Sequence, residues 1–223
     1  VNAKPEAASE RRGGETIPID FAVEDGVSWL SLVRLVLMHD RRDDPALPTR
    51  GTWLEFRGEW ASHLFGSDYD FLRAQVTLRQ WIQMAADRHR LRLGFYGGIV
   101  FGEAPFFYRF YAADLSDLIP SRVLEMNLDH RPASNLLATS IVEMRAEEIA
   151  ARVDVEYGWA FHRGQGALRV LEGYAGAGLF VLADRRDLRV AIPGYHGFSK
   201  IPIDATFDLG VRADTSVGVF QLG

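Results

Sequence analysis

Long stretches of this sequence alternate apolar and polar residues one by one. Between Thr52 and Trp60, apolar residues or glycine occupy every second position, and mostly charged residues stand between them. A period of two residues is that of a β-strand whose two faces meet different surroundings. Comparable patterns are found at 72–82, 91–101, 151–161 and 201–212, with further strands predicted at 29–39, 168–182 and 217–222. The chain is therefore predicted to be all-β with about eight strands, in a range of eight to ten, and residues 16–24 are the candidate for a ninth.

The composition narrows the classes of function. Of the 223 residues 48% are hydrophobic, which predicts a folded protein. The net charge of −5 comes from interspersed acids and bases, so no nucleic-acid partner is expected. The absence of cysteine excludes disulfides, thiolate catalysis and cysteine-based zinc sites. With the histidines far apart and no nucleotide-binding motif, we expect no metal, no cofactor and no enzymatic activity.

The length of the strands separates two all-β alternatives. Strands in soluble barrels and sandwiches average about five or six residues. The alternation here continues for about ten to fifteen, close to what a tilted strand needs to cross a bilayer. Aromatic residues gather near the segment ends, as in interfacial girdles, at Trp53, Trp60, Trp81, Trp159 and Phe161. No apolar run is long enough for a spanning helix, so the sequence predicts an antiparallel, up-and-down transmembrane β-barrel.

The connections between the predicted strands differ on the two rims. One rim carries the short or moderate turns 40–50, 87, 162–166 and 213–216, and the other carries 62–68, 102–145 and 183–200. Short turns on one rim and long loops on the other are typical of bacterial outer-membrane barrels, so we predict that location in a Gram-negative cell. The predicted organisation is a flexible polar arm at 1–15 and a barrel at 16–223 with a long extracellular loop at 102–146. The arm shows no signal-peptide pattern.

If the apolar face meets lipid, the polar face lines the lumen. The charges expected there are Glu55, Arg57, Glu59, Arg73, Arg79, Arg92, Arg152, Asp154, Glu156, Asp204, Asp208 and Arg212. About eight strands leave room only for side chains, so this network is interpreted as structural rather than as a conduction path.

The aromatic run in the long loop has two interpretations, a plug inside the barrel mouth or a partner-binding patch. It comprises Phe106, Phe107, Tyr108, Arg109, Phe110 and Tyr111. The plug is favoured, because a loop folded into the lumen must bury apolar area to offset its ordering entropy. Arg109 is then expected to pair with an inward acid, Glu156 or Asp208.

Three segments resemble the superfamily of outer-membrane assembly and translocation barrels, to which the BamA insertase and the two-partner secretion transporters belong. Residues 40–51, with DRRDDP followed by PTRG, resemble a turn between barrel strands of that family. GSDYDF at 66–71 resembles the start of the next-but-one strand, and PFFYRFY at 105–111 resembles the entry to the long sixth extracellular loop. The resemblance covers residues 30–111 well. It implies the membrane barrel of that superfamily, with the loop after Phe101 partly packed into the lumen.

The sequence also departs from the family pattern. Where the family loop carries an Arg-Gly-aromatic tip, residues 112–122 read AADLSDLIPSR, and the related GYHGF at 194–198 lies in a later loop. The family's periplasmic repeat domains are not expected here, because only the short polar arm precedes the predicted barrel. The last residue, Gly223, is also not the aromatic residue usual at the end of such a strand. These departures bear on whether insertase activity is retained.

The function expected from the resemblance is help with membrane insertion of other molecules, or anchoring of a complex. The expected partners are outer-membrane lipid or lipopolysaccharide, and other outer-membrane or periplasmic proteins. The alternatives are a small passive porin, an outer-membrane hydrolase and a soluble lipocalin-like carrier. A hydrolase would use a rim serine and histidine, with Ser62 and His63 or His130 and Ser134 as candidates, although polar loop residues are the simpler interpretation.

Overall fold

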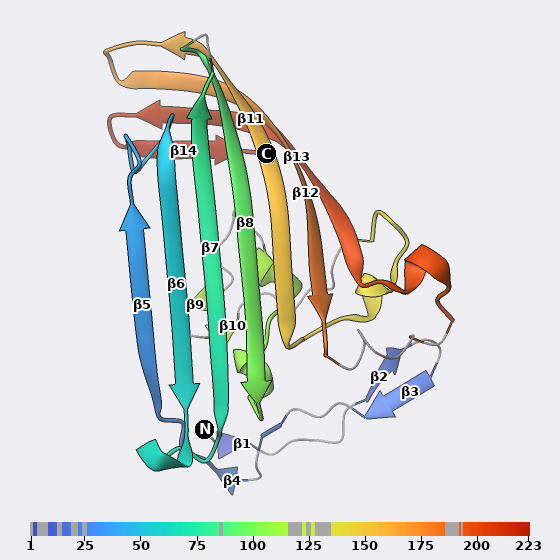
Figure 1. The fold of residues 1–223 in the computed structure, drawn as a ribbon. Helices are drawn as coiled ribbons and strands as arrows, with labels where there is room; N and C mark the ends of the chain where they lie inside the picture. Colours follow the sequence, from blue (N-terminus) through green and yellow to red (C-terminus); the bar gives the residue numbers. More distant parts are fainter. Residues whose placement is uncertain are drawn as a thin grey trace.

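The computed structural model describes residues 26–84, 87–115, 135–185 and 194–223, with Ile192 and short segments at 2–3, 9–12, 15–18, 22–23, 122–123 and 126–127. Eight strands of this part of the chain form one antiparallel sheet (Figure 1). In spatial order they are β5 (Leu32–Asp40), β6 (Gly51–Ala61), β7 (Phe71–Gln83), β8 (His89–Gly102), β11 (Ile149–Arg163), β12 (Leu168–Ala183), β13 (Ile203–Thr215) and β14 (Gly218–Leu222). Each lies beside the next long strand along the chain, so the predicted all-β, up-and-down arrangement is confirmed.

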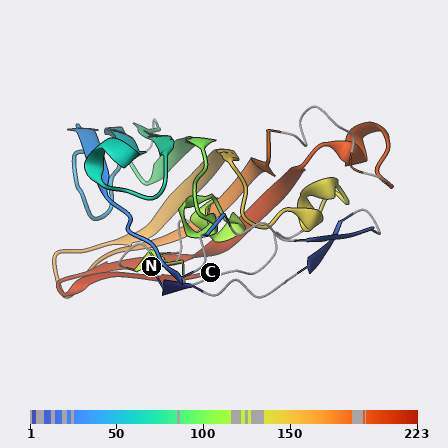
Figure 2. The same ribbon diagram turned by 90° about the horizontal axis from the view of Figure 1, so that it is seen from below.

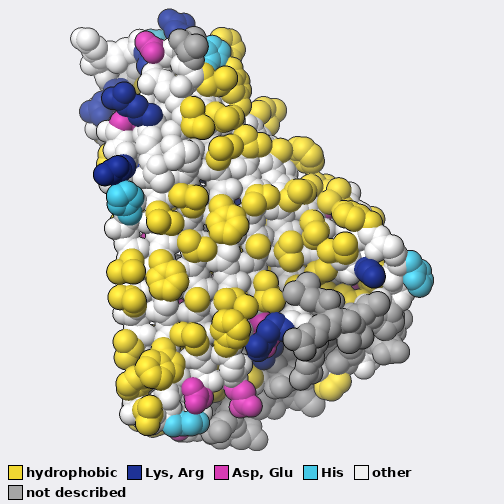
Figure 3. Space-filling view, in the orientation of Figure 1, with side chains coloured by type: hydrophobic (Ala, Val, Ile, Leu, Met, Phe, Trp, Pro, Cys, Tyr) yellow, Lys and Arg dark blue, Asp and Glu magenta, His cyan; other side chains and the backbone are white. Residues whose placement is uncertain are grey.

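The alternation in β11 shows how sequence determines the two faces of the sheet. Val153, Val155 and Tyr157 are exposed on the convex face, and this β-branched and aromatic composition favours an extended backbone. Arg152 and Glu156 point to the concave face and are buried. Figure 3 shows hydrophobic side chains spread over the part of the convex face that is turned toward the viewer. Apolar residues therefore face outward and charged residues inward, the reverse of a sheet that covers a soluble core.

The connections are distributed between the two rims as predicted. The turns at 41–50, 84–88, 164–167 and 216–217 lie at one end of the sheet, the upper end in Figure 1. The connections at 62–70, 103–148 and 184–202 join strands at the other end. The difference in length between the two rims is confirmed.

Asp43 organises the β5–β6 turn. Its carboxylate accepts hydrogen bonds from the backbone N–H groups of Asp44 at 3.0 Å, Thr49 at 2.9 Å and Arg50 at 3.1 Å, and from the Thr49 hydroxyl. Partial burial raises the pKa of Asp43, but the hydrogen bonds outweigh it and hold the pKa below its usual value.

We expect Asp43→Ala to lower the free energy of unfolding by about 1 kcal/mol at neutral pH, a modest figure because the turn is largely exposed. A group whose pKa is depressed on folding stabilises above its unfolded pKa and loses that contribution as pH falls through the folded value. Urea titration in detergent micelles should therefore show the difference from wild type shrinking below about pH 4. The matched control is Asp87→Ala, whose carboxylate accepts one side-chain hydrogen bond from Gln83 at 3.2 Å. An equal loss at pH 3 and pH 7 would refute this role for Asp43.

Segments outside the main sheet form three two-stranded sheets. They are β1 (Asn2–Ala3) with β4 (Gly26–Val27), β2 (Ser9–Arg12) with β3 (Glu15–Pro18), and β9 (Arg122–Val123) with β10 (Met126–Asn127). The candidate ninth strand at 16–24 is thus wrong in its described part, because β3 pairs with β2 and not with the main sheet. Pro18 has no backbone N–H to give to a ladder, which disfavours a place in a long strand. Residues 19–21, 24 and 25 lie outside the described residues.

The buried apolar core lies on the concave face and includes residues of the long connection after β8. Tyr108, Phe110, Ile141 and Met144 pack against sheet residues such as Phe71 and Leu182. Seen from below in Figure 2, the sheet is a curved wall, and the short helical turns of this connection lie along its inner side. These turns are η2 (Phe106–Tyr108), η3 (Ala112–Leu115) and η4 (Ser140–Glu143), and two others, η1 (His63–Phe65) and η5 (Gly197–Lys200), lie in other connections. None of the helices in the described residues is long and apolar enough to cross a membrane.

The sheet is open. In the described part of the chain, no strand pairs with the outer edge of β5 or of β14, and these two strands are not paired with each other. The strand type and order are those predicted, but closure of the eight strands on themselves is not observed. A physical reason is that an eight-stranded barrel has an interior only wide enough for the side chains of its own wall. Here the concave face also holds the segments after β8.

Candidate functional site

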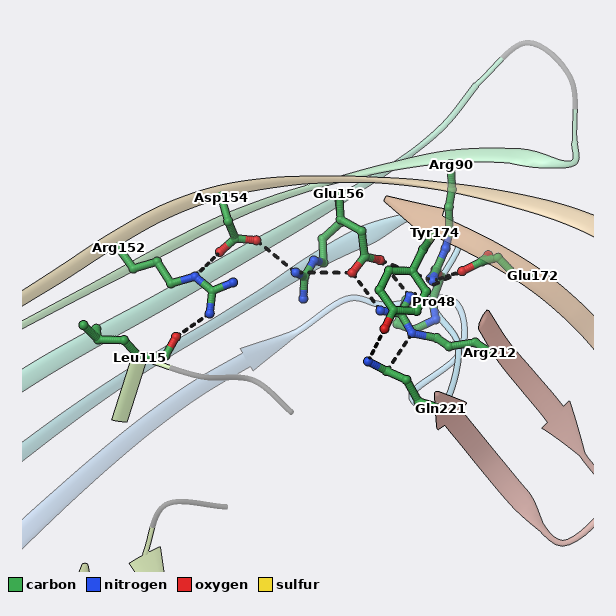
Figure 4. A network of polar contacts seen from close by, with 11 residues as sticks. Pro48, Arg90, Leu115, Arg152, Asp154, Glu156, Glu172, Tyr174, Arg212 and Gln221 are labelled. Carbon is green, nitrogen blue, oxygen red and sulfur yellow. Dashed lines mark hydrogen bonds and ion pairs between the residues drawn. The ribbon is translucent and has the colours of Figure 1, made fainter. Parts of the chain in front are cut away.

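The concave face carries a chain of seven charged side chains, which we call the lumen network. Its members are Arg90, Arg92, Arg152, Asp154, Glu156, Glu172 and Arg212, from β8, β11, β12 and β13 (Figure 4). All occupy even-numbered, inward positions in their strands. Register then brings residues of different strands together, since β11 pairs Glu156 directly with Arg92 of β8 and β12 pairs Glu172 with Arg212 of β13.

Glu156 is the centre of the lumen network. The Arg212 guanidinium donates two hydrogen bonds to it, Nη1 to Oε1 and Nη2 to Oε2, both at 2.7 Å. Arg92 Nη2 lies 3.4 Å from Oε2 and Arg90 Nη2 lies 3.7 Å from Oε1. The carboxylate and Arg90 are buried, and Arg92 and Arg212 are largely buried. Burial disfavours a charged carboxylate unless cations or hydrogen-bond donors compensate for the lost water. The three arginines provide that compensation for Glu156.

The neighbouring acids extend the network in both directions. Asp154 accepts a hydrogen bond from Arg92 Nη2 at 2.9 Å and lies 3.2 Å from Arg152 Nε. Glu172 accepts a hydrogen bond from Arg90 and another from Arg212 Nη1 at 3.3 Å. Four arginines thus alternate with three carboxylates across four adjacent strands, which cross-links the inner face of the sheet.

The network also reaches beyond the long central strands. Arg152 donates to the backbone carbonyl of Leu115 in η3, and Arg90 donates to the carbonyl of Pro48 in the β5–β6 turn at 2.7 Å. Arg212 lies 4.1 Å from the centre of the Tyr174 ring and donates to Gln221 of β14 at 2.9 Å. The network therefore ties the long connection, one rim and an edge strand to the middle of the sheet.

Glycines on the inner face leave room for these large groups. A Cβ at Gly94 would lie 2.5 Å from an Asp154 oxygen, and a Cβ at Gly158 would lie 2.9 Å from Glu172. A Cβ at Gly98 would lie 2.5 Å from the tip of the Phe110 ring. Gly94 and Gly98 of β8 therefore leave the space that the Asp154 carboxylate and the Phe110 ring occupy.

We use the name plug for residues 104–115 and 139–147, the two described parts of the long connection that pack on the concave face. Phe110 and Glu147 exchange two backbone hydrogen bonds of 2.8 Å, which join the two parts. Phe110 is fully buried, and Tyr108 and Tyr111 are nearly so, whereas Phe106, Phe107 and Arg109 are half-buried. The Arg73 guanidinium lies 4.7 Å from the centre of the Phe110 ring, so plug and inner charges are in direct contact.

Other residues expected in the lumen lie apart from the central network. Arg34 and Arg73 both pair with the buried Glu59, at 2.7 and 3.1 Å. Glu55 and Arg57 form a separate, partly exposed pair at 3.1 Å. Arg79 stacks on the Trp53 ring, 5.3 Å from its centre.

Two predicted lumen acids have other surroundings. Asp204 is fully buried and accepts hydrogen bonds from the backbone N–H groups of Leu136 and Leu137 at 3.0 and 2.9 Å, so it holds part of the long connection against β13. Asp208 lies beside Gly176 and forms no ion pair with any residue that the structure describes. Arg109 donates to the carbonyl of Ala104 at 3.4 Å, while Glu156, one of its two expected partners, is held by the three arginines of the network.

Sequence reasoning missed several members of this site, namely Arg34, Arg90, Glu172, Tyr174 and Gln221. The alternation of the strands could have identified some of them, because residues two positions apart share a face. Arg90 lies two positions before Arg92, and Glu172 and Tyr174 occupy inward positions of the strand predicted at 168–182.

The candidate rim serine and histidine form local turn contacts. Ser62 Oγ accepts the N–H of Leu64 at 3.4 Å, and His63 Nδ1 lies 2.7 Å from the carbonyl oxygen of Ser67. His130 and Ser134 lie outside the described residues.

A long-stranded antiparallel sheet with an apolar outer face, a charged inner face and a loop packed inside is the wall of an outer-membrane type of β-barrel. The chain belongs to the Omp85 superfamily, since the model of the Omp85 superfamily domain matches residues 2–115. This is the superfamily of outer-membrane insertion and translocation barrels, so the resemblance seen in the three sequence segments is confirmed.

A solved structure supports the same fold. The chain is similar to BamA from Haemophilus ducreyi lacking POTRA domains 1–3, with a TM-score of 0.60 and 9% sequence identity. The superposition covers 85% of this chain and 37% of that one, so this chain spans little more than a third of the length of its relative. At this identity the likeness shows the fold alone. No curated protein matches the sequence.

Proposed function

We propose that this protein resides in the bacterial outer membrane and assists the insertion of other β-barrel proteins there. The observation that carries the proposal is the outer edge of β5, with which none of the described strands pairs, beside an apolar convex face. An open edge presents backbone donors and acceptors to which another strand can add. At membrane depth these groups have no water to bind, so an incoming strand gains more by pairing there than it would in solution.

The direction of the β5 backbone groups follows from the pairing with β6. The N–H of Arg41, which directly follows β5, donates to Thr52 at 2.8 Å, and register pairs continue regularly from Asp40 with Trp53 to Leu32 with Ala61. In an antiparallel pair, successive residues direct their N–H and C=O groups to opposite sides. The odd-numbered residues of β5 therefore bond to β6, and even-numbered residues such as Val36 and Met38 direct theirs to the open edge.

The other functions are less well supported by the geometry. A passive porin needs an open lumen, whereas the plug and the lumen network occupy the concave face. A hydrolase needs a serine and a base in contact, whereas Ser62 and His63 form separate turn contacts. A soluble carrier would turn its apolar face inward, and here that face is exposed. We therefore propose a non-enzymatic role without a cofactor, with outer-membrane lipid and other barrel proteins as partners.

The test is refolding of the chain into liposomes, followed by measurement of how fast a second, unrelated outer-membrane barrel folds into the same liposomes. The wild type is expected to accelerate that folding. Val36→Pro should remove most of the acceleration, because proline deletes an N–H at the open edge and leaves the ladder to β6 intact. The control is Val36→Ala, which shortens the side chain and keeps the N–H. Equal acceleration by the proline variant and the wild type would refute the role of the edge.

A further inference from the structure

Three aromatic side chains form an exposed cluster on the convex face, close to the rim of short turns. They are Tyr157, Trp159 and Phe161, near the end of β11. His89, the first residue of β8, pairs in register with Trp159, stacks on its ring with 6.4 Å between the ring centres, and shares a hydrogen bond with the Tyr157 hydroxyl. Tyrosine and tryptophan rings combine an apolar body with a polar group, so they prefer the depth at which hydrocarbon meets lipid headgroups. The cluster therefore marks the level of the headgroups on these strands.

Three exposed arginines lie just beyond the aromatic cluster, at the same end of the strands. Arg163 ends β11, and Arg169 lies across the hairpin turn in β12, where its carbonyl accepts the N–H of Gly164 at 2.8 Å. Arg88 directly precedes β8, and its carbonyl accepts the N–H of Ala160 at 2.8 Å, three residues before Arg163. None of the three guanidinium groups forms an ion pair or a hydrogen bond with any residue that the structure describes. Their charge is therefore available to an external anion.

The acids near these arginines have other surroundings. Asp87 accepts a hydrogen bond from Gln83 at 3.2 Å, and Asp214 is buried. At the opposite rim, by contrast, Arg185 is paired with Glu148 at 2.6 Å. Figure 3 shows basic side chains at the upper end of the molecule, where the short turns lie. Within the described part of the chain, this end of the sheet thus keeps positive charge that no carboxylate neutralises, although the net charge of the protein is −5.

We propose that this end of the sheet binds an anionic phospholipid, with the phosphate beside Arg88, Arg163 and Arg169 and the acyl chains along the aromatic cluster. A lipid fits both parts of the surface, because its phosphate is negative and its tails are apolar, whereas a free phosphate ion gains nothing from exposed rings. Guanidinium groups suit the phosphate, since they donate several hydrogen bonds in a planar fork. The described strands β7 and β13 flank β8, β11 and β12, so neither edge of the sheet is involved. The inference rests on the proposed membrane location and names the class of lipid partner.

The test measures which lipids surround a fluorophore near each end of β12, in the chain refolded into phosphatidylcholine vesicles. The native chain has no cysteine, so the fluorophore attaches only at an introduced Leu171→Cys, near the arginines, or Leu179→Cys, toward the other rim. The vesicles contain a small fraction of spin-labelled quencher lipid, either anionic phosphatidylglycerol or zwitterionic phosphatidylcholine. At Leu171→Cys the association constant for phosphatidylglycerol is expected to exceed that for phosphatidylcholine by about fivefold or more, since each arginine near an anionic surface contributes roughly that factor. At Leu179→Cys the two lipids should associate equally.

Two double variants, each made in the Leu171→Cys chain, separate a local site from general charge attraction. Arg163→Gln with Arg169→Gln should remove most of the preference for phosphatidylglycerol. The matched control is Arg145→Gln with Lys200→Gln, which removes the same charge from exposed positions at the opposite rim and should leave the preference unchanged. Inorganic phosphate should lower the preference no more than sodium chloride does at the same ionic strength, because the acyl chains are part of what is bound.

Three results would overturn the inference. Equal association of the two lipids at Leu171→Cys would assign the arginines to another partner, such as an acidic protein segment. An equal loss of preference in both double variants would indicate general attraction without a site, and specific displacement by inorganic phosphate would indicate a site for the free anion.

The same data keep the inference and the proposed function distinguishable. Equal quenching by both lipids would remove the inference and support the membrane location, whereas no quenching by either lipid at both positions would remove the two together. A chain that prefers phosphatidylglycerol at Leu171→Cys but does not accelerate the folding of a second barrel would keep the inference and remove the assisting role.

Discussion

Glu156→Ala is expected to lower the free energy of unfolding by about 3–5 kcal/mol, the usual cost of removing one partner from a buried ion pair. Arg212 donates two hydrogen bonds to this carboxylate, and Arg90 and Arg92 lie within 4 Å of it. Without Glu156 these three cations share the remaining two acids of the lumen network. Since the arginines come from β8 and β13, their repulsion acts across the middle of the sheet. The measurement is a urea titration of the protein in detergent micelles.

The matched control is Glu55→Ala, which removes the acid of a partly exposed pair on the same face of the sheet. Its cost is expected to stay below about 1 kcal/mol, as for other exposed pairs. Glu156→Gln keeps two polar atoms without the charge, so its loss of unfolding free energy should lie between those of Glu156→Ala and Glu55→Ala. Equal effects of Glu156→Ala and Glu55→Ala would contradict the assignment of Glu156 as the centre of the network.

Gly98→Val is expected to expel Phe110 from the concave face and to release the plug. The Cβ alone would lie 2.5 Å from the ring, and Gly98 belongs to β8, whose backbone is held by β7 and β11 on either side. The ring is the part that can move, and the loss of a fully buried phenylalanine costs about 3–5 kcal/mol. Limited proteolysis should then cut the connection at 103–148 much faster than in the wild type.

Two further variants separate displacement of the ring from general damage to the strand. Gly173→Val places the same side chain on the convex face, where Phe161 at 3.6 Å is the one described neighbour of a Cβ, and should leave the rate of proteolysis unchanged. Adding Phe110→Ala to Gly98→Val should restore part of the stability, because the added methyl groups then occupy the vacated space. If the double variant is destabilised by the sum of the single effects, the two residues are not coupled and the explanation fails.

The strands could be predicted from the sequence because their two faces meet opposite surroundings. Period two then appears directly in residues such as Val153, Asp154, Val155 and Glu156, and it also gives the face of each residue. The assignment of short and long connections to the two rims could also be predicted, because in an up-and-down arrangement every second connection lies at the same end of the sheet. The family segments lie at 40–51, 66–71 and 105–111, all within the residues 2–115 that match the Omp85 superfamily domain.

The contacts of the site could be predicted only in part, because they depend on register between strands that are distant in sequence. Nothing local to Glu172 indicates that it meets Arg90, which lies 82 positions earlier. Asp204 looks like another lumen charge in its strand, yet it binds the backbone of Leu136 and Leu137. Whether the sheet closes on itself could not be predicted either, because the alternation within each strand does not show whether the last strand pairs with the first. The roles of the plug and of the lumen network in function stay predictions.

The central claim is that the convex face of the sheet meets lipid while the concave face does not. It is tested most directly by placing single cysteines at successive positions from 152 to 157 in β11, labelling each with a fluorophore and measuring quenching by lipids with spin labels in the bilayer core. The account predicts strong quenching at 153, 155 and 157, and weak quenching at 152, 154 and 156. Quenching without a period of two, or equal access of a water-soluble quencher to all six positions, would contradict it.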